Sequence, residues 1–167
     1  MSKYKGPMTA EEFMKQLSTD TEYLRLRAEK DEKSRIRTER LNGVSKPILM
    51  RLADVGFPAD SFQSLVKQYA PLPEQVVLIL LDSLTKCDEE RIMESLVRAM
   101  GASESPFDGR PLINCFDSTT NEGLRFAILN TIALAKPHSI DKWLEKARQS
   151  ESLRQKLSDL GYDWPQP

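Results

Sequence analysis

The sequence predicts an all-α fold in which antiparallel helix pairs stack side by side, preceded by a long charged N-terminal helix. Three observations support this prediction. Capping residues and apolar residues at helical spacing recur along nearly the whole chain. No segment reads as a strand that has a second strand to pair with. Two stretches, 80–100 and 115–132, share one plan, as in repeat architectures.

The chain divides by these signals into four segments of one structural domain overall. Residues 1–18 hold a short helix, 19–43 the long charged helix, 44–161 the repeats and 162–167 a tail. A chain of 167 residues can bury one core. Its 40% hydrophobic and 29% charged residues are the ordinary balance of a folded protein.

The two N-terminal helices are placed by their caps. Thr9 stands three residues before Glu12, which is the spacing of a capping box. Thr19, Asp20 and Thr21 can each cap the long helix. We expect Asn42-Gly43 to end that helix.

The next three helices are bounded by proline, glycine and polar residues. Pro47 suits the first turn of a helix that ends at Gly56. Asp60 or Ser61 begins a short helix. The third helix, within "PEQVVLILLDSL" (73–84), is apolar all round. We therefore expect it to be buried on every side, as the central helix of the fold.

The remaining helices follow the same signals. Asp88 is expected to cap the next helix, which Gly101 stops. After a turn-rich loop, a short helical piece and a long helix lie within residues 112–135. Ser139 and Ser150 are expected to cap the last two helices.

The internal repeat joins the end of one helix, an Asp-Ser step, a polar turn and an amphipathic helix. The Asp-Ser steps are Asp82-Ser83 and Asp117-Ser118. In the amphipathic helices, Ile92, Leu96, Val97 and Met100 correspond to Leu124, Ile128, Leu129 and Ile132. Helix pairs of this length cannot bury their apolar faces alone, so stacking them forms a continuous core.

The stretch from "MRLADVGFPADSFQSLVKQYAPLPEQVVLILLDSL" through "EERIMESLVRAM" resembles an uncharacterised group of small bacterial HEAT-repeat proteins. The resemblance extends roughly from Leu24 to Ala147. Arg91 and Arg125 only partly match the Asp/Arg ladder of the family, and the loop "GASESPFDG" is longer, which leaves the number of repeats open. The resemblance implies a HEAT-like α-α superhelix, a non-enzymatic adaptor that offers a concave surface to a protein partner.

Side chains suited to chemistry are few. Cys87 and Cys115 are far apart in the sequence, and we interpret them as free thiols rather than a disulfide or a metal site. His138 stands beside Ser139 and near Asp141, an arrangement that suits helix capping better than catalysis. The acidic clusters "CDEER" and "EKDEK" are interpreted as dipole partners and exposed ion pairs. With no phosphate-binding loop either, we expect no enzyme, no cofactor and no metal.

Charge and hydropathy bear on location and partners. The longest apolar run, Val76 to Leu81, is far shorter than the roughly 20 residues of a membrane span. The N-terminal "MSKYKGPMTAEEF" has no apolar core of the signal-peptide kind. We therefore expect a cytoplasmic protein with no membrane contact. The net charge of −1 creates no field that would attract nucleic acid.

The long helix carries seven basic residues interleaved with five acidic ones. Glu29–Lys33 and Asp31–Arg35 are expected to form pairs four residues apart. Because phosphate binding depends on uncompensated positive charge, this interleaving argues against nucleic-acid binding. We expect the helix to buttress the first repeat and to offer a charged rim.

The candidate partner surface combines this rim with an aromatic residue of the tail. Its residues are Arg35, Arg37, Arg40 and Trp164. Trp164 either folds back with Tyr162 to cover the last repeat, which we favour, or anchors a partner; Trp143 is expected in the core. The favoured function is a protein-binding adaptor whose partner the sequence does not identify. The alternatives are an immunity-type inhibitor of a bacterial toxin, by analogy alone, and nucleic-acid binding or base repair by a HEAT-like array.

Overall fold

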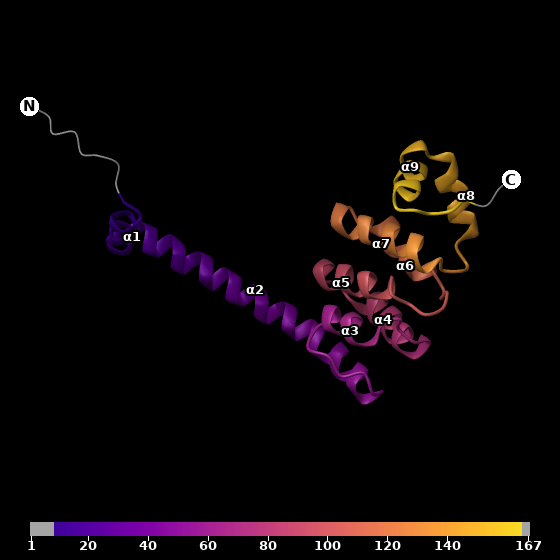
Figure 1. Cartoon of the computed structure of the whole chain (residues 1–167), viewed down its shortest axis with the longest axis horizontal. Coiled ribbons are helices and arrows are strands. Elements are labelled where there is room, and N and C mark those ends of the chain that lie inside the picture. Colours follow the sequence, from indigo (N-terminus) through magenta and orange to yellow (C-terminus); the bar gives the residue numbers. More distant parts are fainter. Residues whose placement is uncertain (1–8, 165–167) are drawn as a thin grey trace, which may run out of the picture. The chain divides into compact units, whose positions relative to one another are not determined.

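The computed structural model describes residues 9–164, apart from the side chains of Glu12 and Gln16, and the described residues form an all-α structure (Figure 1). They contain nine helices, no strand and two isolated β-bridges. The predicted all-α class and the long N-terminal helix are thereby confirmed. The helices are α1 (Ala10–Thr19), α2 (Thr21–Asp54), α3 (Phe62–Tyr69), α4 (Glu74–Lys86), α5 (Glu90–Met100), α6 (Arg110–Ser118), α7 (Glu122–Ala135), α8 (Asp141–Gln149) and α9 (Glu151–Asp159).

Contacts within the chain divide it into two compact units, Met1–Arg40 and Leu41–Pro167. The first unit contains α1 and the N-terminal part of α2. Of the three predicted candidates, Asp20 caps α2, because its Oδ1 accepts hydrogen bonds from the backbone N–H groups of Glu22 and Tyr23 at 3.0 and 3.1 Å. The carboxylate thus satisfies two donors that lack a partner in the first helical turn.

Helix α2 continues through the predicted boundary at residues 42–43, so that boundary is wrong. Pro47 lies inside the helix rather than in the first turn of a new one. A glycine and a proline in a helix interior cost roughly 4 kcal/mol together. Burial of Ile48 (8% exposed) and Leu52 (0%) offsets this, since each such side chain stabilises by about 1.5–3 kcal/mol.

The end of α2 is the one predicted. Gly56 has φ +94°, a conformation that glycine adopts at little cost. Its N–H donates to the Ala53 carbonyl, and the N–H of Phe57 donates to the Leu52 carbonyl, both at 2.9 Å. This pair of hydrogen bonds is a Schellman motif, which closes the helix at the glycine.

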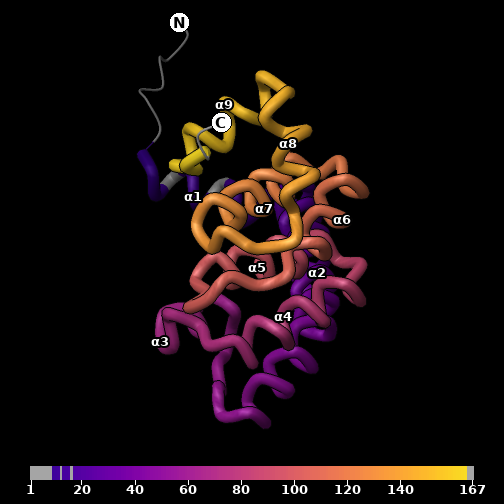
Figure 2. Tube along the Cα trace, turned by 90° about the vertical axis from the view of Figure 1, so that its right-hand side faces the viewer, coloured from indigo at the N-terminus to yellow at the C-terminus, as the bar shows by residue number. Residues whose placement is uncertain are grey.

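The helices of the second unit lie in two rows. α5 contacts both α3 and α7, and α7 contacts both α5 and α9. α4 contacts α5 and α6, and α6 in turn contacts α7. Figures 1 and 2 show the helices following one another in layers, from α3 and α4 to α8 and α9. The two similar stretches of sequence therefore end in α5 and α7, which are neighbours in one row.

The positions matched in the internal repeat face the core, as predicted. All eight are at most 7% exposed: Ile92, Leu96, Val97, Met100, Leu124, Ile128, Leu129 and Ile132. A hydrogen bond also joins the two helices, because the fully buried Thr131 donates from Oγ1 to the carbonyl of Val97 at 2.8 Å. Equivalent apolar faces of α5 and α7 therefore share one core.

Three local predictions for this unit need correction. Leu78 of α4 is 54% exposed, so α4 is not buried on every side, because α5 and α6 cover only part of it. Asp88 does not cap α5, which begins one residue later than predicted, with Glu89 at the N-cap and no side-chain cap. Ser150 is both the C-cap of α8 and the N-cap of α9, and it forms no side-chain cap hydrogen bond at α9.

Candidate partner-binding groove

A groove of about 790 Å³ lies between α2, α3 and α5, entirely within the second unit. We call it the α2–α3–α5 groove. Its apolar lining residues are Leu41, Leu49, Phe62, Val66, Ile92 and Ala99. Its polar lining residues are Asn42, Ser45, Asp60, Ser61, Gln63, Lys67, Ser95 and Arg98. Apolar side chains are thus interspersed with hydroxyl, amide and charged groups.

The α3 wall of this groove is positioned by a capping box. Ser61 Oγ accepts a hydrogen bond from the N–H of Ser64 at 3.1 Å, and Ser64 Oγ accepts one from the N–H of Ser61 at 2.9 Å. The reciprocal bonds fix where α3 begins, as the sequence predicted for Ser61. Phe62 and Val66 follow one turn apart, which places both on the side of α3 that lines the groove.

One face of α5 forms another wall. Ile92, Ser95 and Ala99 are spaced three and four residues apart, so they lie on one side of the helix. At the edge, the guanidinium of Arg98 donates from Nε and Nη2 to Oε1 of Glu94, at 3.0 and 2.8 Å. This ion pair holds a charged side chain in a defined direction beside the apolar lining.

Cys87 and Cys115 line a second groove, of about 640 Å³. Both are free thiols, as predicted. Burial raises the pKa of both thiols above the ordinary value, and Cys115 is only 6% exposed. A thiol with a raised pKa is protonated near neutral pH, and the thiolate is the reactive form. These cysteines are therefore poor nucleophiles.

His138 and Ser139 bond to each other, and Ser139 does not cap α8. His138 Nδ1 lies 2.8 Å from Ser139 Oγ, and Ser139 has φ +67°. Ile140 occupies the N-cap position, and no side chain caps the helix there. The predicted cap is wrong because the serine hydroxyl is engaged by the neighbouring imidazole. Asp141 lies in the first turn of α8, where a carboxylate suits the helix dipole.

The predicted arginines of the rim differ in their surroundings. Arg35 is held by two carboxylates, donating to Glu32 and Glu39 at 2.7 Å each. Hydrogen bonding to Arg35 lowers the pKa of Glu32. Arg37 forms no ion pair with any residue between 9 and 164, whereas Arg40 is exposed at the end of the first unit. Arg37 is therefore better placed than Arg35 to meet a partner.

The ion pairs of α2 are not the ones predicted. Glu29 pairs with Arg25 at 2.7 Å, and Asp31 lies 3.9 Å from Arg27. Lys33 is consequently left without an ion pair within residues 9–164, as is Lys30. Lys30, Lys33 and Arg37 are spaced three and four apart, so they lie on one side of the helix. Helical spacing could have shown that Lys30 and Lys33 lie on one side of the helix. Spacing does not show that they lack ion pairs, because arginine contacts carboxylates better than lysine and binds the nearby acidic side chains.

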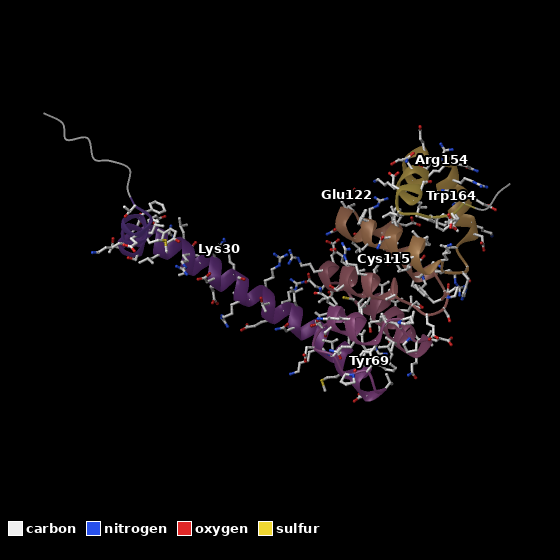
Figure 3. The ribbon with its side chains drawn as sticks, in the orientation of Figure 1. Lys30, Tyr69, Cys115, Glu122, Arg154 and Trp164 are labelled. Atoms are coloured by element: carbon white, nitrogen blue, oxygen red, sulfur yellow. The ribbon has the colours of Figure 1, made fainter. Side chains whose placement is uncertain are left out.

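Trp164 folds back onto the last helices. Its ring meets Tyr162 edge to face at 5.0 Å, and its indole N–H donates to Ser158 Oγ at 3.1 Å. The guanidinium of Arg148 lies 5.9 Å from the ring centre. Figure 3 labels Trp164 beside α9. Of the two predicted roles, these contacts favour the cover.

Trp143 is half-buried and meets the ring of Phe116 edge to face at 5.4 Å, which agrees with the predicted place in the core. Within residues 9–164, no three His, Cys, Asp or Glu side chains gather as metal ligands do. No helix in that same part of the chain has both the length and the apolarity to cross a membrane. No protein-family model, no curated protein and no solved structure matches this chain.

Proposed function

We propose that this protein is a non-enzymatic scaffold of the HEAT-repeat type that binds a protein partner in the α2–α3–α5 groove. The observation that carries the proposal is the lining of this groove, in which apolar side chains stand beside charges of both signs. A protein surface with apolar anchors and a polar edge is complementary to such a lining. A small metabolite would instead need a convergent set of polar groups in an enclosed cavity.

The packing of the second unit supports the scaffold interpretation. α3, α5, α7 and α9 contact one another in sequence order, and the matched apolar positions of α5 and α7 are buried together. An array stabilised by contacts between neighbouring units can present one long side to a partner. The protonated state of both thiols supports a role without nucleophilic chemistry.

The test is a pair of substitutions in the groove, Leu49→Glu and Val66→Glu, introduced separately into the full chain. Both residues are half-buried at the groove. A carboxylate placed in an apolar interface should weaken binding about tenfold or more, because it is desolvated without a partner. The measurement is affinity capture from native cells, followed by calorimetric titration of the protein that co-purifies.

Leu78→Glu is the matched control, since Leu78 is 54% exposed on α4 and does not line the groove. The proposal expects one partner to be retained by the native chain and the Leu78 variant and lost by both groove variants. Equal retention by all of them, or no enriched protein, would contradict it. Circular dichroism verifies that each variant is folded.

A further inference from the structure

Six residues of α2 in the first unit follow the spacing of a coiled-coil seam. They are Glu22, Leu26, Glu29, Lys33, Ile36 and Arg40, alternately four and three residues apart. In a heptad notation these are successive d and a positions, so all six lie along one side of the helix. The seam falls within Met1–Arg40 and does not involve the groove.

The seam is chemically complementary to itself when it is read in the opposite direction. Reversal about residue 31 matches Glu22 with Arg40, Leu26 with Ile36 and Glu29 with Lys33. An antiparallel pair of helices places an a residue of one helix opposite a d residue of the other, and all three matches have this form. Each match occurs twice in a symmetric pair, so two copies would place acid against base and apolar against apolar throughout.

The four inner residues of the seam, from Leu26 to Ile36, are exposed, whereas Arg25 binds both carboxylate oxygens of Glu22. Leu26 is 52% exposed and Ile36 is 54% exposed. Lys33 has no ion pair with residues 9–164, and Glu29 uses Oε1 for Arg25. A carboxylate has two oxygens and about four acceptor sites, so Glu29 can bond to a second cation while keeping Arg25.

We propose that α2 pairs in antiparallel orientation with α2 of a second copy through this seam. The contact is isologous, so it closes into a two-fold dimer and leaves no open end. A second copy of α2 offers a basic residue to each acid of the seam, an acid to each basic residue and an apolar residue to each apolar one, all in one register. A partner helix that is only acidic or only basic would complement the charges of one sign alone. The seam is roughly 28 Å long and mostly polar. In this pairing Lys30 of one copy lies beside Lys30 of the other, and these like charges repel. The dimer is therefore weak.

The test is sedimentation velocity of the full chain over a range of micromolar concentrations. The native chain should shift from monomer to dimer as its concentration rises. Lys33→Glu and Glu29→Lys each place like charges across the seam twice, and each should weaken the dimer about tenfold or more. The double variant E29K/K33E restores acid against base only if residue 29 faces residue 33 of the other copy, and it should dimerise like the native chain.

Ile36→Asp should abolish the dimer, because it places a charge in each of the two apolar layers. The matched control is Leu24→Asp, since Leu24 is 42% exposed on the other side of α2. A chain that remains monomeric at every concentration overturns the proposal. So does a dimer that tolerates Lys33→Glu, or a double variant that stays monomeric. The groove variants should dimerise normally, so the outcome is independent of the proposed partner binding.

Discussion

Thr131 illustrates how one buried polar group joins two neighbouring helices. Its side chain is fully buried in α7, and its hydroxyl bonds to the Val97 carbonyl of α5. Thr131→Val keeps the shape of the side chain but removes the donor. We expect a loss of about 1 kcal/mol in the free energy of unfolding, the usual net contribution of such a bond.

This loss would be measured by urea unfolding followed by circular dichroism. Thr120→Val is the control, because Thr120 is exposed and a surface change of this kind usually stays within about 0.5 kcal/mol. Equal effects of the two substitutions would show that the hydroxyl of Thr131 contributes no stability.

Asp82 makes the stability of the second unit depend on pH. Hydrogen bonds from Lys86 and then Arg51 lower the pKa of this carboxyl from its ordinary value of 3.8. A depressed folded-state pKa gives stability that is present above the unfolded pKa and is lost as the pH falls through the folded pKa. Asp82→Asn should therefore lower the unfolding midpoint at neutral pH, and its difference from the native chain should vanish in acid.

Thermal unfolding of both chains from neutral pH to about pH 2 measures this difference. A difference that is the same at every pH would mean that the effect of Asp82 is not ionic. A pH-dependent difference would show that Asp82 is held by at least one of its two cations, Lys86 or Arg51, in solution.

At the scale of elements, Gly109 and Gly43 should respond in opposite ways to replacement by alanine. A Cβ on Gly109, at the start of α6, would lie 2.7 Å from Ile140 Cγ2 and 3.0 Å from Pro137 Cβ. Gly109→Ala should destabilise by about 1–3 kcal/mol, because the added methyl overpacks this junction. Gly43 has nothing within 4 Å of an added Cβ and lies inside α2.

Gly43→Ala should therefore stabilise by about 0.5–1 kcal/mol, since alanine is the better helix former. Chemical unfolding of the Gly109→Ala and Gly43→Ala variants tests the expected loss and the expected gain in the free energy of unfolding. A destabilised Gly43 variant would contradict a continuous α2, because it would require a backbone conformation at residue 43 that only glycine adopts readily.

At the scale of the whole molecule, the two units should differ in local stability. In the second unit, α5 and α7 contain fully buried residues, whereas nearly every residue of α2 from 21 to 40 is exposed. Local opening costs least where few apolar contacts are broken. Amides of residues 21–40 should exchange at least about 100-fold faster than those of α5 and α7.

Hydrogen exchange followed by mass spectrometry measures this ratio. It is best done with the Lys33→Glu variant, so that pairing between copies does not protect α2. Similar protection in both units would contradict the prediction and would mean that residues 21–40 are stabilised by contacts other than those described.

Helix caps and helix ends could be predicted from the sequence where contacts between neighbouring residues fix them. Asp20, Ser61 and Gly56 act through their own neighbours in the chain, so their caps and stops were predictable. The cap predicted at Ser139 was wrong because its hydroxyl bonds to His138. The cap predicted at Asp88 was wrong because α5 begins one residue later, with Glu89 at the N-cap. The groove was not predicted at all, since its residues come from three separate helices.

The sequence by itself determined the all-α class and the repeated apolar positions, because each follows from spacing along one helix. Only the tertiary structure decided that α2 runs through Gly43 and Pro47, and that α2, α3 and α5 enclose a groove. The reason is physical. Helical periodicity shows which side of a helix is apolar, whereas burial against other helices determines which breaks are tolerated and which side chains meet.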